Sequence, residues 1–263
     1  MSVTSEPSSL ARQARQALLL WSIFFVAAIV LNGTLPFILG VDLRPWTQSP
    51  AKSILFSFVV YAVLFLAAPL IIIKGQKTVR QPAFLVPLCI AMAALTFWQV
   101  LRGIAVVSVI VLAYLHWRFD LADYGIKSHG WKGDVLAILL MGVLGLVPVL
   151  LRSSPLSLSP ARALLAGLDR LLANPASLVE NLFYFGFLAE RLSYRTGKWL
   201  TPLLIGLMYT AHEMTNPEYW YGGTSFVVIF VGVTFWAALY LWRRGAVAIW
   251  LGDGVYRFVG KLV

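Results

Sequence analysis

The chain has few charged residues, one cysteine and three histidines among its 263 residues. Charged residues make up 12% of the sequence, whereas soluble domains carry about 25%. Cys89 has no second cysteine to pair with, so an intrachain disulfide is excluded. Apart from a polar N-terminal tail over residues 1–16, no shift in composition, internal repeat or low-complexity run marks off a soluble domain.

Hydrophobic residues make up 60% of the sequence, and the mean hydropathy is +0.81. A helix needs roughly 20 apolar residues to cross a bilayer. Several uncharged stretches approach or reach this length, which predicts an all-α fold. We expect a polytopic transmembrane helical bundle of about eight membrane helices, forming one membrane domain over residues 17–263. The helices that supply these spans, some of them short for a full crossing, are predicted at 17–40, 53–73, 83–117 (two helices meeting near Arg102), 134–151, 177–192, 199–212, 225–242 and 245–258.

One further predicted helix differs from these spans because charged residues interrupt it. Residues 161–172 place Arg162, Asp169 and Arg170 among leucines and alanines, after a loop over residues 152–160 that is rich in Ser and Pro. This mixture is typical of an amphipathic interfacial helix. We therefore expect the helix to lie on the membrane surface.

The formal net charge of +10 comes from cations spread over short connections between the predicted spans. Because Lys and Arg accumulate in cytoplasmic loops of membrane proteins, this pattern predicts a multi-pass membrane protein, with the lipid bilayer as its partner and no nucleic acid. The cations expected to face the cytoplasm are Arg12, Arg15, Lys74, Lys77, Arg80, Arg191, Arg195, Lys198, Arg243 and Arg244.

Ionisable residues inside the predicted spans are rare, and they mark candidate functional positions because a charge in lipid is costly without a partner or a cavity. Glu180 lies in the span 177–192, and His212 ends the next one. If these helices form an antiparallel hairpin that turns at residues 195–198, each residue lies about 16 positions, or roughly 24 Å, from the turn. The carboxylate and the imidazole would then lie at one depth.

A buried carboxylate beside an imidazole can activate water, or both groups can ligate a metal ion. Structural alternatives stay open, since Glu180 could cap a helix N-terminus and His212 could be hydrogen-bonded at an interfacial helix end. The segment 252–254, Gly-Asp-Gly, either supplies a third polar group, Asp253, or marks a helix break with a local Asp turn.

Other polar and aromatic residues have simpler interpretations. Glu190 with Arg191 and Arg195 is predicted to form a solvated helix end, and Asn216 could support the imidazole from one turn further on. Two histidines are assigned to the interface or to a loop, and several tryptophans near span ends are assigned to an aromatic belt. These residues are His116, His129, Trp117, Trp199, Trp220 and Trp242.

Three segments carry a resemblance to a known family. They are residues 180–188 (Glu-Asn-Leu-Phe-Tyr-Phe-Gly-Phe-Leu), the helix end 209–212 (Tyr-Thr-Ala-His) and the basic turn 194–199, preceded by a lead segment over residues 121–134. Over about residues 119–263, the chain resembles the CPBP family of CAAX-processing and bacteriocin-processing membrane proteases, also called Abi proteins. The resemblance implies an endopeptidase of a bacterial plasma membrane that cleaves a membrane-associated peptide or protein. Glu180 and His212 would activate water, with or without a divalent metal such as zinc.

The chain departs from the family pattern in the first and the third motif. The first motif, Glu-Glu-x-x-x-Arg-Gly, has Asn181 at its second position and Phe185 in place of Arg, and the third motif, His-x-x-x-Asn, falls on residues 253–257. Asn181 cannot act as a base, and Phe185 lacks the five donors of Arg. Asp253 could complete a metal site with Glu180 and His212.

These departures leave two other functional hypotheses open. The first is a catalytically inactive relative that binds a membrane protein or peptide, as a scaffold or an immunity-type factor. The second is a transporter, which the lack of a visible repeat and of a second charge pair within the spans disfavours.

Overall fold

The computed structural model describes residues 7–30, 38–40, 57–96, 125–126, 130–150, 159–168, 171, 175–213 and 226–262. Within these residues every regular element is a helix and no strand occurs, which confirms the all-α prediction. The helices include two π-helices, η2 and η5. They are α1 (Pro7–Ile29), η2 (Ser57–Ala67), α5 (Ala68–Lys74), α6 (Gln76–Val79), α7 (Pro82–Thr96), α9 (Trp131–Gly145), α10 (Val147–Leu150), α11 (Pro160–Leu168), α12 (Pro175–Asn181), η5 (Leu182–Ala189), α13 (Glu190–Glu213), α15 (Phe226–Arg243) and α16 (Ala246–Leu262).

The predicted spans correspond to helices whose ends are shifted. α1 begins at Pro7, so the described part of the predicted polar tail is helical. The span 53–73 is divided between η2 and α5, and the span 134–151 between α9 and α10. Several predicted features lie outside the described residues: the helix boundary near Arg102, His116, His129, Trp117, Asp169, Arg170, Asn216 and Trp220.

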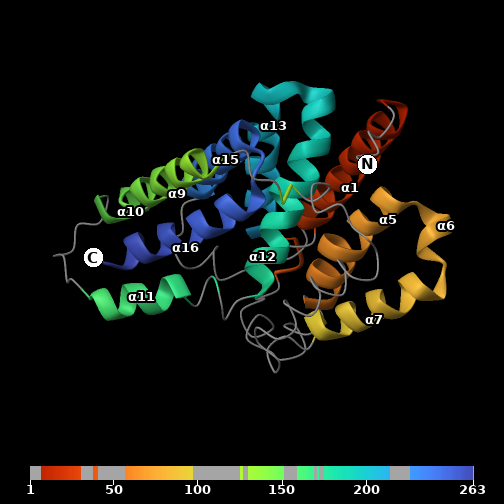
Figure 1. Ribbon diagram of the computed structural model, residues 1–263, viewed down its shortest axis with the longest axis horizontal. Coiled ribbons are helices and arrows are strands. Elements are labelled where there is room, and N and C mark those ends of the chain that lie inside the picture. Colours follow the sequence, from red (N-terminus) through yellow and green to blue (C-terminus); the bar gives the residue numbers. More distant parts are fainter. Residues whose placement is uncertain are drawn as a thin grey trace.

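The helices form three neighbouring groups (Figure 1). On one side, α16 packs between α9 and α11, and on the other side η2 packs against α7. Between these groups, α13 packs against α1 and α15, and α12 contacts both η2 and α16. The α12–η5–α13 segment therefore connects the two sides of the molecule.

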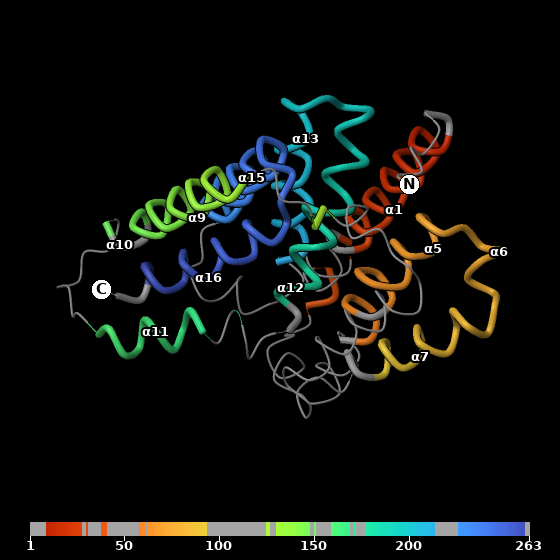
Figure 2. The backbone as a smooth tube through the Cα atoms, in the orientation of Figure 1, coloured from red at the N-terminus to blue at the C-terminus, as the bar shows by residue number. Residues whose placement is uncertain are grey.

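The α13 segment is a helical hairpin with its turn at Gly197 (φ 71°, ψ 172°). Glycine is essentially the only residue that occupies this region of φ/ψ space. The Thr196 and Thr201 hydroxyl oxygens lie 2.8 Å apart across the turn, and Thr201 Oγ1 donates to the Gly197 carbonyl at 2.7 Å. In Figure 2 the chain enters the turn through one arm and returns through the other. The predicted antiparallel hairpin with a turn at residues 195–198 is thus confirmed.

Many apolar side chains point outward from the helices. α15 is long and apolar enough to cross a membrane by length and composition, and it alone passes that test in the part of the chain that the structure describes. The other predicted crossings stay predictions. Outward-facing side chains that are at least 55% exposed occur on α1 (Leu19, Ile23, Val26), α9 (Leu139, Val143) and α15 (Val227, Val231).

Small residues allow α16 to pack closely on its neighbours. A Cβ atom added at Gly145 of α9 would lie 2.7 Å from the Tyr256 carbonyl oxygen, and one at Gly252 would lie 2.3 Å from Met141 Sδ. Such close approach through glycine is common between membrane helices. Because α16 runs unbroken from Ala246 to Leu262, the alternative of a helix break at residues 252–254 is wrong.

The helix predicted at residues 161–172 corresponds to α11, which lies along α16. Ala163 is fully buried, and a Cβ atom added at Gly167 would lie 3.1 Å from the Gly254 carbonyl oxygen. Leu164 and Leu165 are 53% and 66% exposed. One face of the helix therefore packs on α16 and another presents leucines outward, while its location on a membrane surface stays a prediction.

Candidate functional site: a buried Glu, Tyr and His cluster

Tyr184 connects the two arms of the hairpin at the level of His212. Its ring is stacked on the His212 imidazole, with centroids 5.9 Å apart and planes 25° from parallel. It also contacts Tyr209, one turn before His212, at 4.9 Å between centroids. Because Glu180 lies about one turn before Tyr184 in the same helical segment, Glu180 and His212 are at neighbouring depths, while their pairing in one site stays a prediction.

Glu180 is the carboxylate at this level, and only 3% of its surface is exposed. It is the sixth residue of α12, whose first turn contains no acidic residue, so the alternative of Glu180 as an N-terminal cap is wrong. The Tyr184 hydroxyl lies within electrostatic reach of both Glu180 and Glu213. That hydroxyl is buried and has no hydrogen-bond partner among the described residues, so it is available as a donor or an acceptor.

Aromatic rings enclose His212, which is 5% exposed. Phe65 of η2 and Phe24 of α1 lie 5.3 Å and 6.1 Å from the imidazole centroid, and Tyr184 and Tyr209 complete the enclosure at 5.9 Å each. His212 is thus at a helix end, as one alternative predicts, but it is surrounded by side chains from three other helical segments. In such an apolar enclosure, electrostatic interactions are stronger than in water.

Asn181 and Ser177 hold the α12 backbone beside Glu180. Asn181 Nδ2 donates to the Ser177 carbonyl oxygen at 2.7 Å, and Trp250 Nε1 of α16 donates to Ser177 Oγ at 3.1 Å. All of these groups except the Trp250 indole are buried. The Asn181 amide is therefore bonded within its own helix, and a supporting role for it at the site stays a prediction.

Asp253 is completely buried on α16, one turn after Trp250. Its Oδ1 atom lies 3.9 Å from Arg257 Nε. The described residues, which include Glu180, His212 and Asp253, contain no group of three or more His, Cys, Asp or Glu side chains placed to hold a metal ion. A zinc site made by Glu180, His212 and Asp253 therefore stays a prediction.

Phe185 takes the position of the family's arginine and points away from His212. It is 1% exposed and lies 6.3 Å from the Tyr240 ring of α15. Adjacent residues on a helix point about 100° apart, which is consistent with Tyr184 meeting His212 while Phe185 meets α15. Phe185 therefore makes an apolar contact between η5 and α15.

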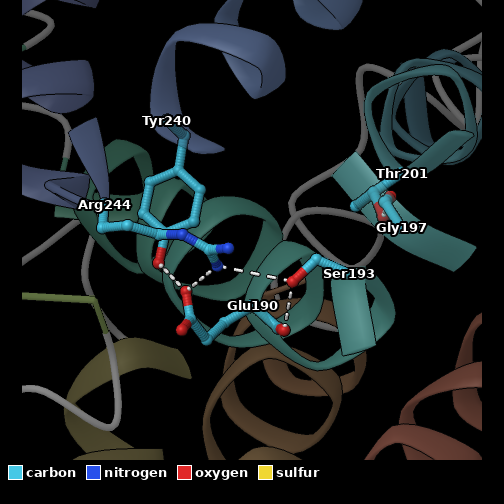
Figure 3. A network of polar contacts seen from close by, with 6 residues as sticks. All are labelled: Glu190, Ser193, Gly197, Thr201, Tyr240 and Arg244. Carbon is cyan, nitrogen blue, oxygen red and sulfur yellow. Dashed lines mark hydrogen bonds and ion pairs between the residues drawn. The ribbon is translucent and has the colours of Figure 1, made fainter. Parts of the chain in front are cut away.

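A second polar cluster lies outside the Glu180 site, around Glu190 (Figure 3). Arg244 Nη1 and Tyr240 Oη donate to Glu190 Oε2 at 2.6 Å and 3.0 Å. Ser193 Oγ lies 3.4 Å from the same Arg244 nitrogen and donates to the Glu190 carbonyl at 2.8 Å. The cluster joins the end of α15 to the first arm of the hairpin.

The prediction of a solvated helix end at residues 190–195 is therefore wrong for two of its three residues. Glu190 is partly buried by Arg244, and Arg191 is 3% exposed, with its guanidinium carbon 5.0 Å from the Phe187 ring centroid. Only Arg195 is exposed as predicted. The correction arises because α1 and α15 cover this arm of the hairpin.

Comparison with protein-family models, with curated proteins and with solved structures finds no significant match for this chain. The likeness to CPBP proteases thus depends on the segments quoted from the sequence. A helical fold is compatible with many activities, so only the chemistry of the site points to a function.

Proposed function

We propose that this chain is an intramembrane endopeptidase of the CPBP type, located in a bacterial plasma membrane. Its substrate is a membrane-associated peptide or protein, and Glu180 and His212 activate the water that hydrolyses the peptide bond. The observation that carries this proposal is the burial of a carboxylate and an imidazole at neighbouring depths, both adjacent to Tyr184. Such a pair is a common arrangement for general acid and base catalysis.

The distribution of polar and apolar side chains supports a membrane location. Glu180, His212 and Asp253 are each at most 5% exposed, while leucines and valines on α1, α9 and α15 point outward. Soluble proteins seldom bury ionisable residues while exposing so many large aliphatic ones. In a bilayer this arrangement places apolar atoms against lipid and keeps the polar groups inside the bundle.

The proposed reaction assigns one step to each side chain. The Glu180 carboxylate accepts a proton from water while the water oxygen attacks the carbonyl carbon of the scissile peptide bond. His212 orients the attacking water through a hydrogen bond, and the Tyr184 hydroxyl donates a hydrogen bond to the oxyanion that forms. The proton then passes from Glu180 to the departing nitrogen and the C–N bond breaks. The products are a carboxylic acid and an amine, which exchange a proton to become a carboxylate and an ammonium.

The second candidate is a catalytically inactive membrane protein that binds a peptide or protein, as a scaffold or an immunity-type factor. Phe185 favours it, because this buried ring packs on Tyr240 where the family has a cation. The loss of that cation removes donors that would orient neighbouring carboxylates. A binding protein would need the shape of the bundle but not the Glu180 carboxylate.

Substitution of Glu180 separates these candidates. Cells producing the wild type, Glu180→Gln, His212→Gln or Glu190→Gln are compared by mass spectrometry of newly formed N-termini in membrane proteins. A peptidase generates cleavage products that disappear in Glu180→Gln and His212→Gln. The same products persist in Glu190→Gln, a matched carboxylate change outside the site. If the set of N-termini is identical in wild type and Glu180→Gln at equal protein levels, the peptidase proposal is rejected.

A further inference from the structure

Several helix ends are tied together around the hairpin turn. Arg191 Nε donates to Gln13 Oε1 at 3.3 Å, which joins α13 to the first half of α1. Arg244 joins the end of α15 to Glu190, as Figure 3 shows. The beginning of α1, the hairpin turn and the connection between α15 and α16 thus belong to one end of the molecule.

The beginning of α9 belongs to the same end. Arg243 Nε donates to Asp134 Oδ1 at 3.3 Å, and Arg243 Nη2 donates to the Gly130 carbonyl oxygen at 2.9 Å. Asp134 and Glu190 are therefore each paired with an arginine from the end of α15. Further cations at this end are exposed, and we call this group of residues the basic end: Arg12, Arg15, Lys132, Arg195 and Lys198.

Three tryptophans at the same helix ends each lie beside a neighbouring cation. Lys198 Nζ is 5.5 Å from the Trp199 ring centroid, Lys132 Nζ is 5.9 Å from that of Trp131, and Arg243 Cζ is 5.4 Å from that of Trp242. All three are largely exposed: Trp199 by 82%, Trp131 by 70% and Trp242 by 54%. Tryptophan favours the boundary between hydrocarbon and headgroups, and nearby Lys and Arg can extend from this level to the phosphates.

We propose that the basic end binds the phosphate groups of anionic phospholipids, with Trp131, Trp199 and Trp242 at the headgroup boundary. Among the residues that the structure describes, the pairing of Asp134 and Glu190 within the protein leaves the exposed cations as the dominant charge of this surface. Near an anionic membrane, each such cation strengthens binding by about fivefold. This inference requires the proposed membrane location but is independent of peptide cleavage.

The experiment uses the full-length protein in a neutral detergent. Its thermal unfolding is followed during titration with dioctanoyl phosphatidylglycerol or dioctanoyl phosphatidylcholine. The anionic lipid is expected to raise the Tm at concentrations where the zwitterionic lipid does not. For Arg195→Gln/Lys198→Gln, the same rise in Tm should require about 25-fold more phosphatidylglycerol, because two cations have been removed.

Arg162→Gln/Arg257→Gln is the matched control, because it removes two exposed cations from α11 and α16. Arg257 lies about 16 Å along α16 from Ala246, the first residue of that helix, and so lies away from the basic end. The control is therefore expected to respond to phosphatidylglycerol like the wild type. Equal losses in the two double variants, or equal effects of the two lipids, would overturn the proposal. Inorganic phosphate should have no comparable effect, and full stabilisation by phosphate alone would reject a lipid ligand.

A vesicle experiment distinguishes failure of the lipid proposal from failure of the membrane location. The protein is expected to insert into vesicles of phosphatidylcholine alone and of its mixture with phosphatidylglycerol. A chain that inserts into neither contradicts the membrane location and with it this inference. Retained lipid selectivity in Glu180→Gln would support the inference whatever the outcome of the cleavage assays.

Discussion

Tyr184 and His212 lie with their rings stacked, 5.9 Å between centroids, at the point where η5 meets the second arm of α13. Tyr184→Phe removes only the hydroxyl, which has no hydrogen-bond partner among the described residues. We expect the variant to unfold at or slightly above the wild-type temperature, since a buried unpaired polar group costs about 1–3 kcal/mol. If the hydroxyl stabilises the oxyanion, cleavage of a substrate should slow by about 100-fold.

Tyr184→Leu provides the comparison for this prediction. It removes ring contacts with Phe65, Tyr209 and His212. Each such contact stabilises the fold by about 0.5–1.5 kcal/mol in addition to the hydrophobic effect of the area it buries. We therefore expect Tyr184→Leu to lower the free energy of unfolding by a few kcal/mol and Tyr184→Phe to leave it nearly unchanged. Unimpaired cleavage by a folded Tyr184→Phe protein would exclude a catalytic role for the hydroxyl.

Gly197 sets the geometry that brings the two arms of the hairpin together. Its φ and ψ of 71° and 172° are unfavourable for any residue with a Cβ atom, although nothing lies within 4 Å of that position. Gly197→Ala should therefore lower the free energy of unfolding by about 1–3 kcal/mol through the backbone alone. The neighbouring exposed substitution Lys198→Ala is expected to change stability by less than about 0.5 kcal/mol.

Circular dichroism of the detergent-solubilised variants during heating measures both changes. Gly197→Ala should also reduce activity in the cleavage assay, because the turn determines which residues of the two arms face one another. An alanine variant as stable as Lys198→Ala would show that the turn adopts another conformation.

The hairpin and its polar pair could be predicted because spacing along two helices is a local property of the sequence. Equal distances of Glu180 and His212 from a basic turn were sufficient to place them at similar depths. Tyr184 was not singled out, because an aromatic residue in an apolar helix is more often part of the core. The sequence feature that could have identified Tyr184 is its spacing of one helical turn from Glu180. This spacing indicates a role at the site only once the His212 imidazole is known to face the Tyr184 ring from the other arm.

Features that depend on other helices could not be predicted in the same way. Glu190 and Arg191 have the composition of a solvated helix end, but α15 and α1 approach this arm and cover them. The π-helical geometry of η2 and η5 has no composition that distinguishes it from ordinary helix. The burial of Asp253 follows from the packing of α16 between α9 and α11, which depends on residues distant in sequence.

Two substitutions of Arg244 can separate the stabilising effect of its ion pair with Glu190 from the energetic cost of its backbone conformation. Arg244 has a φ of 56°, which costs a residue with a side chain roughly 1–2 kcal/mol. Arg244→Met removes the ion pair and keeps that cost, whereas Arg244→Gly removes both. Since the pair is partly exposed, we expect Arg244→Met to lower the free energy of unfolding by about 1–2 kcal/mol.

Arg244→Gly should be more stable than Arg244→Met by about 1 kcal/mol, because glycine adopts positive φ without steric cost. Chemical denaturation of the two variants and the wild type gives all three values. If glycine were the more destabilising substitution, the backbone at this position would not be strained. The arginine would then contribute through its ion pair alone.

The close packing of α9 and α16 predicts opposite outcomes for two glycine substitutions in helices. A Cβ atom at Gly145 would lie 2.7 Å from the Tyr256 carbonyl oxygen, and the backbone of α16 would have to move away. Overpacking of this kind costs about 1–3 kcal/mol, which exceeds the gain of roughly 1 kcal/mol that alanine gives in a helix. Gly145→Ala should therefore lower the free energy of unfolding.

Gly232 of α15 is the matched control, because no atom lies within 4 Å of the position that its Cβ would take. Gly232→Ala should leave stability unchanged or raise it by up to about 1 kcal/mol through helix propensity. Thermal unfolding of both variants in the same detergent decides between the expectations. If Gly145→Ala were as stable as Gly232→Ala, α9 and α16 could not be in the close contact described here, and Asp253 would lose the packing that buries it.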